Sequence, residues 1–340
     1  VYVLIAIIVK FAGVRWINKL MPAVIIGPTV AIIGLSLAGN AVSDAISIAK
    51  TDGGVFQMNL HGWLCLICAL VTLAVVTVCS VYGKKMAKLI PFVIGIIAGY
   101  LVATVFTVIG NATGNEAMVI IDFSRFANMQ WYPDFTFIKA AKGLSEINGQ
   151  YIATIAVAYV PVAFVVFAEH IADHKNLSSI IGHELLEEPG LHRTLLGDGV
   201  GSIVGAIFGG APNTTYGESV GCVAITGNAS VYTIFTTAIL AIIASFFAPF
   251  VTFLATIPSC VMGGVCITLY GFIAVSGLKM IQKIDLGDNH NLFVVSVILI
   301  TGIGGMSIGI GPVTITEVAS ALILGILTNL LLSGKKKDEK

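Results

Sequence analysis

Charged residues are scarce in this sequence. Of 340 residues, 18 are Lys or Arg and 18 are Asp or Glu, which together make 11% of the chain, against about 25% in soluble domains. The residues AVILMFWYC make up 57%, and the mean hydropathy is +0.98. So few charges cannot cover the surface of a soluble body of this size. The shortage excludes a soluble fold and indicates a polytopic membrane protein.

Three other features are missing. A basic excess is absent, because the net charge is zero, and this argues against a nucleic-acid partner. The six cysteines lie in or beside apolar runs, and the Cys65–Cys68 pair has no strand–helix context, so neither a disulfide framework nor a metal site is predicted. The chain starts at Val1 without a charged segment or a cleavage site, so no signal peptide is predicted. We expect it to begin inside a membrane helix.

Long apolar runs are what the sequence does contain. A membrane-spanning helix needs about 20 apolar residues. Six runs meet or nearly meet this length: Trp63–Val81, Leu89–Ile109, Ile152–Ala168, Val231–Ala255, Val261–Leu278 and Leu292–Ile310. Val24–Ala38 and Val318–Leu332 are shorter candidates, and Val1–Gly13 has the character of the tail of a cut helix.

The basic residues between these runs predict an orientation. If each run crosses once and Lys84 lies inside, 14 of the 18 Lys and Arg residues fall in inside loops and in the C-terminal tail. Cytoplasmic loops carry such an excess, so a cytoplasmic C-terminus is predicted. The count holds only if the glycine-rich segments 199–210 and 217–227 also act as membrane elements.

Ionisable residues within apolar runs usually mark function, because burying them in a membrane is costly. Glu169 directly follows the apolar run that ends at Ala168, and His170 and Asp173 come next. Glu169 and Asp173 are four residues apart, so they share a face if this segment is helical. Asp198 is followed by Gly199 and is interpreted as a helix N-cap.

A second acidic residue, Glu218, ends the segment Gly-Gly-Ala-Pro-Asn-Thr-Thr-Tyr-Gly-Glu at residues 209–218. Proline and glycine prevent an ordinary helix here, and threonine with tyrosine favours extended backbone. Irregular backbone at membrane depth is tolerated only when it is buried in protein or lines a water-filled cavity. Secondary transporters bind substrate at such discontinuous segments. The pattern therefore predicts a binding site at Glu218.

Two carboxylates would disfavour an anionic ligand but suit a neutral planar molecule that has N–H donors beside C=O acceptors. The carboxylates would accept its N–H groups, and free backbone N–H groups would donate to its carbonyls. A nucleobase fits this description. A carboxylate at depth can also bind and release a proton, which would couple transport to a proton gradient.

Several motifs resemble the nucleobase–ascorbate transporter family, in its bacterial uracil permease branch. They are Ala-Glu-His-Ile at 168–171, the segment at 209–218, Pro-Gly-Leu-His-Arg at 189–193 and Pro-Ser-Cys-Val-Met-Gly-Gly at 258–264. The resemblance extends through nearly the whole chain. It implies an all-α polytopic fold of fourteen spans in two inverted repeats of seven, with a short β-strand in span 10. A core domain (spans 1–4 and 8–11) moves against a gate domain (spans 5–7 and 12–14).

Mapped onto this sequence, the resemblance implies domain boundaries. Residues 1–13 would end span 4, and spans 1–3 would be missing. Residues 24–110 would form gate spans 5–7, 111–150 an external loop, 151–257 core spans 8–11, 258–333 gate spans 12–14 and 334–340 a cytoplasmic tail. Related transporters pair through their gate domains, which implies a homodimer.

By similarity, Glu169 and Glu218 would bind the base, the backbone N–H of Gly217 would donate to it, and Tyr216 would line the site. The family signature after the site glutamate is represented by Ser219, Gly221 and Thr226. Ser219 replaces the usual asparagine.

The uracil permease has a proton-coupling histidine four residues after the span-8 glutamate, where this chain has Asp173. Asp173, Glu218 and His170 are therefore the candidates for proton coupling. No cofactor is predicted, and the coupling ion is a proton, with sodium as the alternative.

The function predicted from the sequence is import of a nucleobase, most specifically uracil, across a bacterial plasma membrane (the inner membrane) by proton symport. The alternatives are a xanthine or purine permease, a sodium-coupled symporter of the same family, and an anion exchanger or channel of the related sulfate-transporter type. An intramembrane enzyme is not predicted, because nothing orients a nucleophile toward His170 and Glu169. A non-transporting partner subunit is a further alternative for the chain as it stands.

Overall fold

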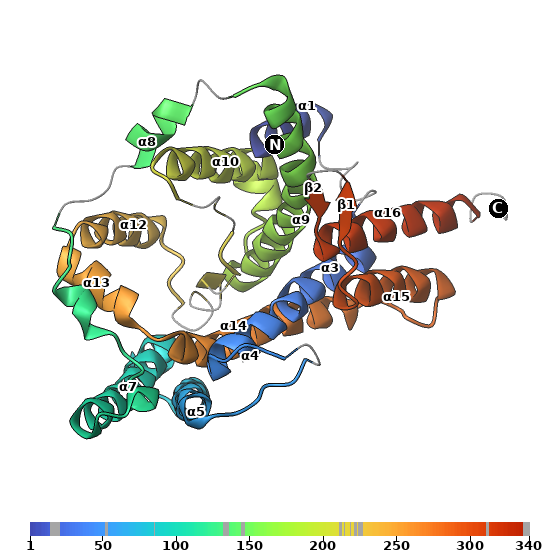
Figure 1. The fold of residues 1–340 in the computed structure, drawn as a ribbon. Helices are drawn as coiled ribbons and strands as arrows, with labels where there is room; N and C mark the ends of the chain where they lie inside the picture. Colours follow the sequence, from blue (N-terminus) through green and yellow to red (C-terminus); the bar gives the residue numbers. More distant parts are fainter. Residues whose placement is uncertain are drawn as a thin grey trace. The chain divides into compact units, whose positions relative to one another are not determined.

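A computed structural model describes residues 1–13, 21–51, 54–84, 86–131, 136–143, 147–210, 213, 215–217, 219–220, 223, 227–310 and 313–335. These residues are predominantly helical (Figure 1). The longer helices are α1 (Tyr2–Ala12), α3 (Ala23–Ser36), α4 (Ala38–Ile46), α5 (Leu60–Tyr82), α7 (Pro91–Thr113), α8 (Thr136–Gly143), α9 (Gly149–Ile181), α10 (Leu191–Ile207), α12 (Val231–Ser245), α13 (Ala248–Thr256), α14 (Ser259–Ile281), α15 (Asn289–Ile303) and α16 (Glu317–Lys335). Short turns are α6 (Met86–Leu89), η1 (Glu116–Met118), η2 (Phe123–Phe126) and η4 (Leu186–Gly190).

The chain forms two compact units. The first unit comprises Val1–Ser36, Phe135–Gly221 and Phe272–Lys340, and the second comprises Leu37–Asp134 and Cys222–Gly271. In the first unit, α15 packs against α3 and α16, and α1 packs against α10 (Figure 1). Its apolar core includes Ile25 and Ile32 of α3, Ile298 of α15 and Phe167 of α9. The core therefore holds α9, which carries the predicted acidic residues, from one side.

The second unit is built on a close pair of helices, α5 and α7. Gly95 and Gly99 of α7 face α5 so closely that a side chain at either position would overlap Val76 or Thr72. Small residues of this kind let membrane helices approach each other. The hydroxyl groups of Tyr100 and Thr256 lie 2.9 Å apart, which joins α7 to the end of α13.

Four helices among the described residues are long and apolar enough to cross a membrane: Ala23–Ile46, Leu60–Tyr82, Pro91–Thr113 and Ser259–Ile281. The predicted run Val231–Ala255 is not one straight helix. α12 ends at Ser245, and α13 starts at Ala248 after an 89° bend. Pro249 in the first turn of α13 explains the break, because proline is favoured where a helix begins and disfavoured inside one.

The prediction of a single span over Leu292–Ile310 is also wrong at its C-terminal end. α15 ends at Ile303, where Gly304 and Gly305 follow, the latter with a φ of 69°. The strands β1 (Ile308–Ile310) and β2 (Val313–Ile315) then form an antiparallel pair with Gly309 opposite Thr314. The described residues are therefore not purely α-helical. Isoleucine and valine made this stretch look like a span, but they also favour strands.

α9 is longer than the apolar run that predicted it. The helix is 33 residues long and continues through Pro161. The Asn148 side chain accepts a hydrogen bond from the Tyr151 N–H at its start, and Gly182 (φ 70°) ends it. Residues 169–174 therefore lie inside one continuous helix, which agrees with the shared helix face predicted for Glu169 and Asp173.

Candidate functional site

The C-terminal half of α9 carries the ionisable residues that the sequence singled out. Glu169 and Asp173 are both half-buried, and their spacing of four residues places them on one helix face. His170 between them is only 2% exposed. The acidic face of α9 is thus turned toward the interior of the first unit.

Some of the described residues between α10 and α12 have the irregular backbone that was predicted for residues 209–218. Asn213, Thr215 and Tyr216 lie in neither helix nor strand, and a helical turn begins at Gly217. The short strand expected here is not present at the described positions of this segment. The hydroxyl of Ser202 in α10 donates to the carbonyl of Asn213 at 3.1 Å, which holds the segment on α10.

Gly217 lies directly against Asp173. A Cβ atom at Gly217 would lie 3.1 Å from Oδ1 and 3.2 Å from Oδ2 of Asp173. Only glycine lets the backbone come this close to the carboxylate without displacing it. The structure therefore brings together two residues that are 44 positions apart in the chain.

The other predicted residues of this segment differ in how far the structure describes them. Tyr216 is 62% exposed. Ser219 is half-buried, and its N–H donates to the Tyr216 carbonyl at 3.1 Å. Glu218, Gly221 and Thr226 lie outside the described residues, and their roles stay predictions.

His170 is the centre of a polar cluster that joins α9, α10 and the irregular segment. Its Nδ1 lies 2.8 Å from Oγ1 of Thr215 and 3.2 Å from Oδ2 of Asp198. Its Nε2 lies 3.0 Å from Oγ1 of Thr194. The His174 ring stacks on the His170 ring, with centroids 4.1 Å apart. The cluster fixes Thr215, and with it the start of the Tyr216–Gly217 stretch, beside α9.

Asp198 was interpreted as a helix N-cap, and that interpretation is wrong. It lies within α10, one turn after Thr194, and faces His170. The sequence did contain one relevant pattern: Thr194 and Asp198 are four residues apart, which places both polar side chains on one face of a helix. The sequence could not show that both side chains meet a histidine on another helix.

A cavity of about 230 Å³ lies next to this cluster, within the first unit. Its walls come from α1, α9 and α10, and Asn213 of the irregular segment completes them. The lining residues are Val1, Tyr2, Val3, Tyr159, Ala163, Val166, Gly199, Ser202, Ile203 and Asn213. The walls are mainly apolar, with a few polar groups, as is usual for small-molecule sites.

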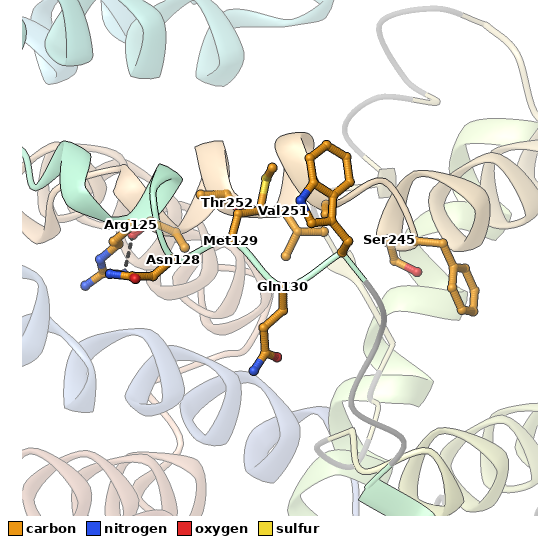
Figure 2. A pocket seen from close by; sticks show the side chains of 11 residues that line it. Arg125, Asn128, Met129, Gln130, Ser245, Val251 and Thr252 are labelled. Carbon is orange, nitrogen blue, oxygen red and sulfur yellow. Dashed lines mark hydrogen bonds between the residues drawn. The ribbon is translucent and has the colours of Figure 1, made fainter.

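The second unit contains a separate, larger pocket of about 390 Å³ between the loop after η2 and the bend of α12 and α13 (Figure 2). Arg125 at its edge donates from Nη1 to the carbonyl of Ala255 at 2.6 Å. Nearby, the hydroxyl and N–H of Ser124 donate to Asp122, which lowers the pKa of that carboxyl group. None of the residues that the sequence singled out as a site lines this pocket. We therefore place the candidate site in the first unit.

The cluster in the first unit offers carboxylate acceptors, hydroxyl groups and a backbone close to a carboxylate. This set can bind a neutral polar ligand and hold a proton. Among the described residues, no three His, Cys, Asp or Glu side chains are grouped so that they could hold a metal ion. Apolar helices of spanning length together with such a site define a multi-pass membrane protein.

Comparison with known proteins identifies the family. A model of a permease family matches residues 1–310. The chain is 40% identical over 340 residues to the uracil permease of Bacillus caldolyticus, covering 98% of this chain and 73% of that protein. It is 36% identical to the uracil permease of Bacillus subtilis, covering 100% of this chain and 74% of that protein. It is 33% identical to the uracil permease of Escherichia coli K12, covering 97% of this chain and 71% of that protein.

The chain belongs to this permease family. The resemblance read from its motifs is thereby confirmed. The members it matches are transporters rather than enzymes.

Proposed function

We propose that the protein imports a nucleobase, uracil, by proton symport. The observation that carries this proposal is the contact between Gly217 and Asp173, which lie where an irregular segment meets the acidic face of α9. The chain is also 33–40% identical to three proteins named uracil permease. Secondary transporters hold their substrates at discontinuous segments of this kind.

The chemistry of uracil matches the groups that this site offers. Uracil presents N–H donors beside C=O acceptors. In our proposal Glu169 and Glu218 accept its N–H groups, the backbone N–H of Gly217 donates to a carbonyl, and the exposed ring of Tyr216 lines the site. Hydrogen bonds to charged groups are worth about 1.5–3 kcal/mol each, so two carboxylates supply much of the binding energy of a small base.

The proposed transport cycle is alternating access. The core domain, which includes α9 and α10, would move against the gate domain in a fold of two inverted repeats. The C-terminus would be cytoplasmic, because the excess of Lys and Arg in the predicted inside loops favours this orientation. Two copies would pair through their gate domains.

Uptake of labelled uracil tests the proposal. The full-length protein in proteoliposomes, with an inward pH gradient, is expected to accumulate uracil above the outside concentration. Excess unlabelled uracil should abolish the signal, while xanthine, adenine and uric acid should leave most of it. Collapse of the pH gradient with a protonophore is the control for coupling.

Two outcomes would contradict this prediction. Competition by xanthine as strong as by uracil would replace the pyrimidine assignment with a purine one and point to Ser219 as the cause. Absence of uptake for every base, from protein shown to be folded, would refute nucleobase transport itself.

Asp173 is the proposed proton-binding residue of α9 that lies against Gly217. We expect Asp173→Asn to flatten the pH dependence of uracil uptake, because an amide cannot take up a proton at this position. Uptake measured from pH 5.5 to 8 would show the effect. Asp285→Asn, at an exposed position in the loop before α15, is a matched control that should keep the wild-type profile. An unaltered profile for Asp173→Asn would remove Asp173 from the coupling mechanism.

A further inference from the structure

His170 is nearly fully buried, yet both of its ring nitrogens face polar side chains. It is 2% exposed, and its three nearest polar partners come from α10 and from the irregular segment. Buried polar networks are costly unless every donor meets an acceptor. The positions of the protons in this cluster can therefore be worked out from its contacts.

The first proton is placed by Thr194. Its hydroxyl group donates to the carbonyl of Leu191 at 3.1 Å. A hydroxyl group has one proton, so the oxygen of Thr194 is an acceptor toward His170. The arrangement that satisfies both contacts has Nε2 of His170 protonated and donating to Thr194 over 3.0 Å.

The second ring nitrogen then faces a carboxylate. Nδ1 of His170 lies 3.2 Å from Oδ2 of Asp198, whose side chain is only 15% exposed. A bare Nδ1 could accept a hydrogen bond from the Thr215 hydroxyl at 2.8 Å, but its lone pair would still repel the charged carboxylate oxygen of Asp198. A proton between the two atoms removes the repulsion, whether the pair is imidazolium with carboxylate or imidazole with carboxylic acid. In both forms the pair is neutral overall, which suits a buried position.

The groups around the pair favour one shared proton and disfavour a second cation. His174, stacked on His170, uses its Nδ1 to donate to the His170 carbonyl at 2.8 Å. If both His170 and His174 were protonated on both ring nitrogens, two cationic rings would be stacked face to face. Tyr2 of α1 meets the His170 ring edge-on, with centroids 6.0 Å apart, and its buried hydroxyl has no hydrogen-bond partner among the described residues. Glu169 and Asp173 of α9 are the flanking carboxylates.

Thr215 connects the pair to the proposed substrate site. Its Oγ1 lies 2.8 Å from the same Nδ1 atom, and Tyr216 and Gly217 follow it directly. Loss of the shared proton would leave an imidazole lone pair and a carboxylate in contact. That repulsion would separate α9 from α10 at the point where Thr215 is held.

We propose that His170 and Asp198 form a buried pair that binds one proton between Nδ1 and Oδ2 and thereby positions the Thr215–Gly217 stretch. The pair is a second proton-binding site beside Asp173. Its link to transport rests on the function proposed above, whereas the shared proton itself does not. Asp198 and His170 act on the substrate through the backbone, so they are positioning residues.

Nitrogen NMR tests the shared proton without any transport assay. The full-length protein, with ¹⁵N-labelled histidine rings, would be measured in lipid bilayers between pH 6 and 8, and His170→Gln would assign the His170 signals. We expect a protonated Nε2 and an Nδ1 signal that is characteristic of a proton shared with a carboxylate. Asp198→Asn should move the Nδ1 signal to that of a neutral ring without a shared proton. His174→Gln is the control that should leave Nε2 protonated.

Two results would overturn the pair: a bare Nε2 in the wild type, or an Nδ1 signal that Asp198→Asn does not change. The link to the site is tested by equilibrium binding of uracil over the same pH range. Asp198→Asn is expected to weaken binding about tenfold and change its pH profile, and Asp198→Glu should restore much of both. Wild-type affinity and pH profile in Asp198→Asn would refute the positioning role. Failure of the wild type to bind any base would refute the proposed function instead, while the NMR result would still decide the pair.

Discussion

Replacing Glu169 by glutamine is expected to lower the affinity for uracil by about 10- to 100-fold. Glu169 is half-buried in α9, on the face that meets Gly217 through Asp173. The substitution keeps the shape of the side chain but turns a charged acceptor into a neutral amide. A hydrogen bond to a charged group contributes about 1.5–3 kcal/mol, and each 1.4 kcal/mol corresponds to a tenfold change in affinity. Binding of labelled uracil to the purified protein measures this directly.

The control for this experiment is Glu187→Gln. Glu187 is exposed in η4, outside the apolar helices. The Glu187→Gln variant should therefore bind uracil with the affinity of the wild type. We expect Glu218→Gln to behave like Glu169→Gln, since both carboxylates are proposed to hold the base. Unchanged affinity in both site variants would show that the base does not bind between α9 and the irregular segment.

The second large effect is expected on stability, from Gly277→Ala in α14. A Cβ atom at Gly277 would lie 2.6 Å from both Cα of Ala31 and the carbonyl oxygen of Gly27. These are backbone atoms of α3, so no side chain can rotate away, and the two helices must move apart. Overpacking of a well-packed contact costs about 1–3 kcal/mol. We expect the thermal unfolding midpoint of the detergent-solubilised protein to fall by several degrees.

Gly271→Ala is a matched control in the same helix. Nothing lies within 4 Å of the Cβ position at Gly271. Alanine is favoured over glycine inside a helix by about 0.5–1 kcal/mol, so this variant should be as stable as the wild type or slightly more so. The difference between the two variants isolates the contact with α3. Equal midpoints would mean that α3 and α14 do not touch at Gly277.

Local patterns in the sequence predicted the elements that depend on local chemistry. The apolar runs located α5, α7 and α14, and proline and glycine correctly predicted irregular backbone at Asn213, Thr215 and Tyr216. Two runs were predicted as single spans and are not. Apolar composition records the affinity of a segment for the membrane, but it does not show where a helix bends, as at Phe246 and Phe247, or where a helix is followed by a pair of strands.

The candidate site was predictable only in part, for a related reason. Glu169, His170 and Asp173 stood out because ionisable residues are unusual beside an apolar run. Asp198 did not stand out, because an aspartate before glycine is common at helix ends. Its role depends on the contact with His170, 28 positions earlier in the chain. Spacing within one helix carries no information about such a partner.

The length of α9 has a consequence for access to the site. Its 33 residues make a helix about 50 Å long, whereas the hydrocarbon layer of a bilayer is about 30 Å thick. Even when strongly tilted, the helix must project into the headgroup region at one end or both. Lys175 is exposed, and it lies two residues after Asp173. In a membrane-crossing orientation, the last turns of α9 would therefore lie at the level of the headgroups, so that Asp173 would be closer to the membrane surface than to its midplane.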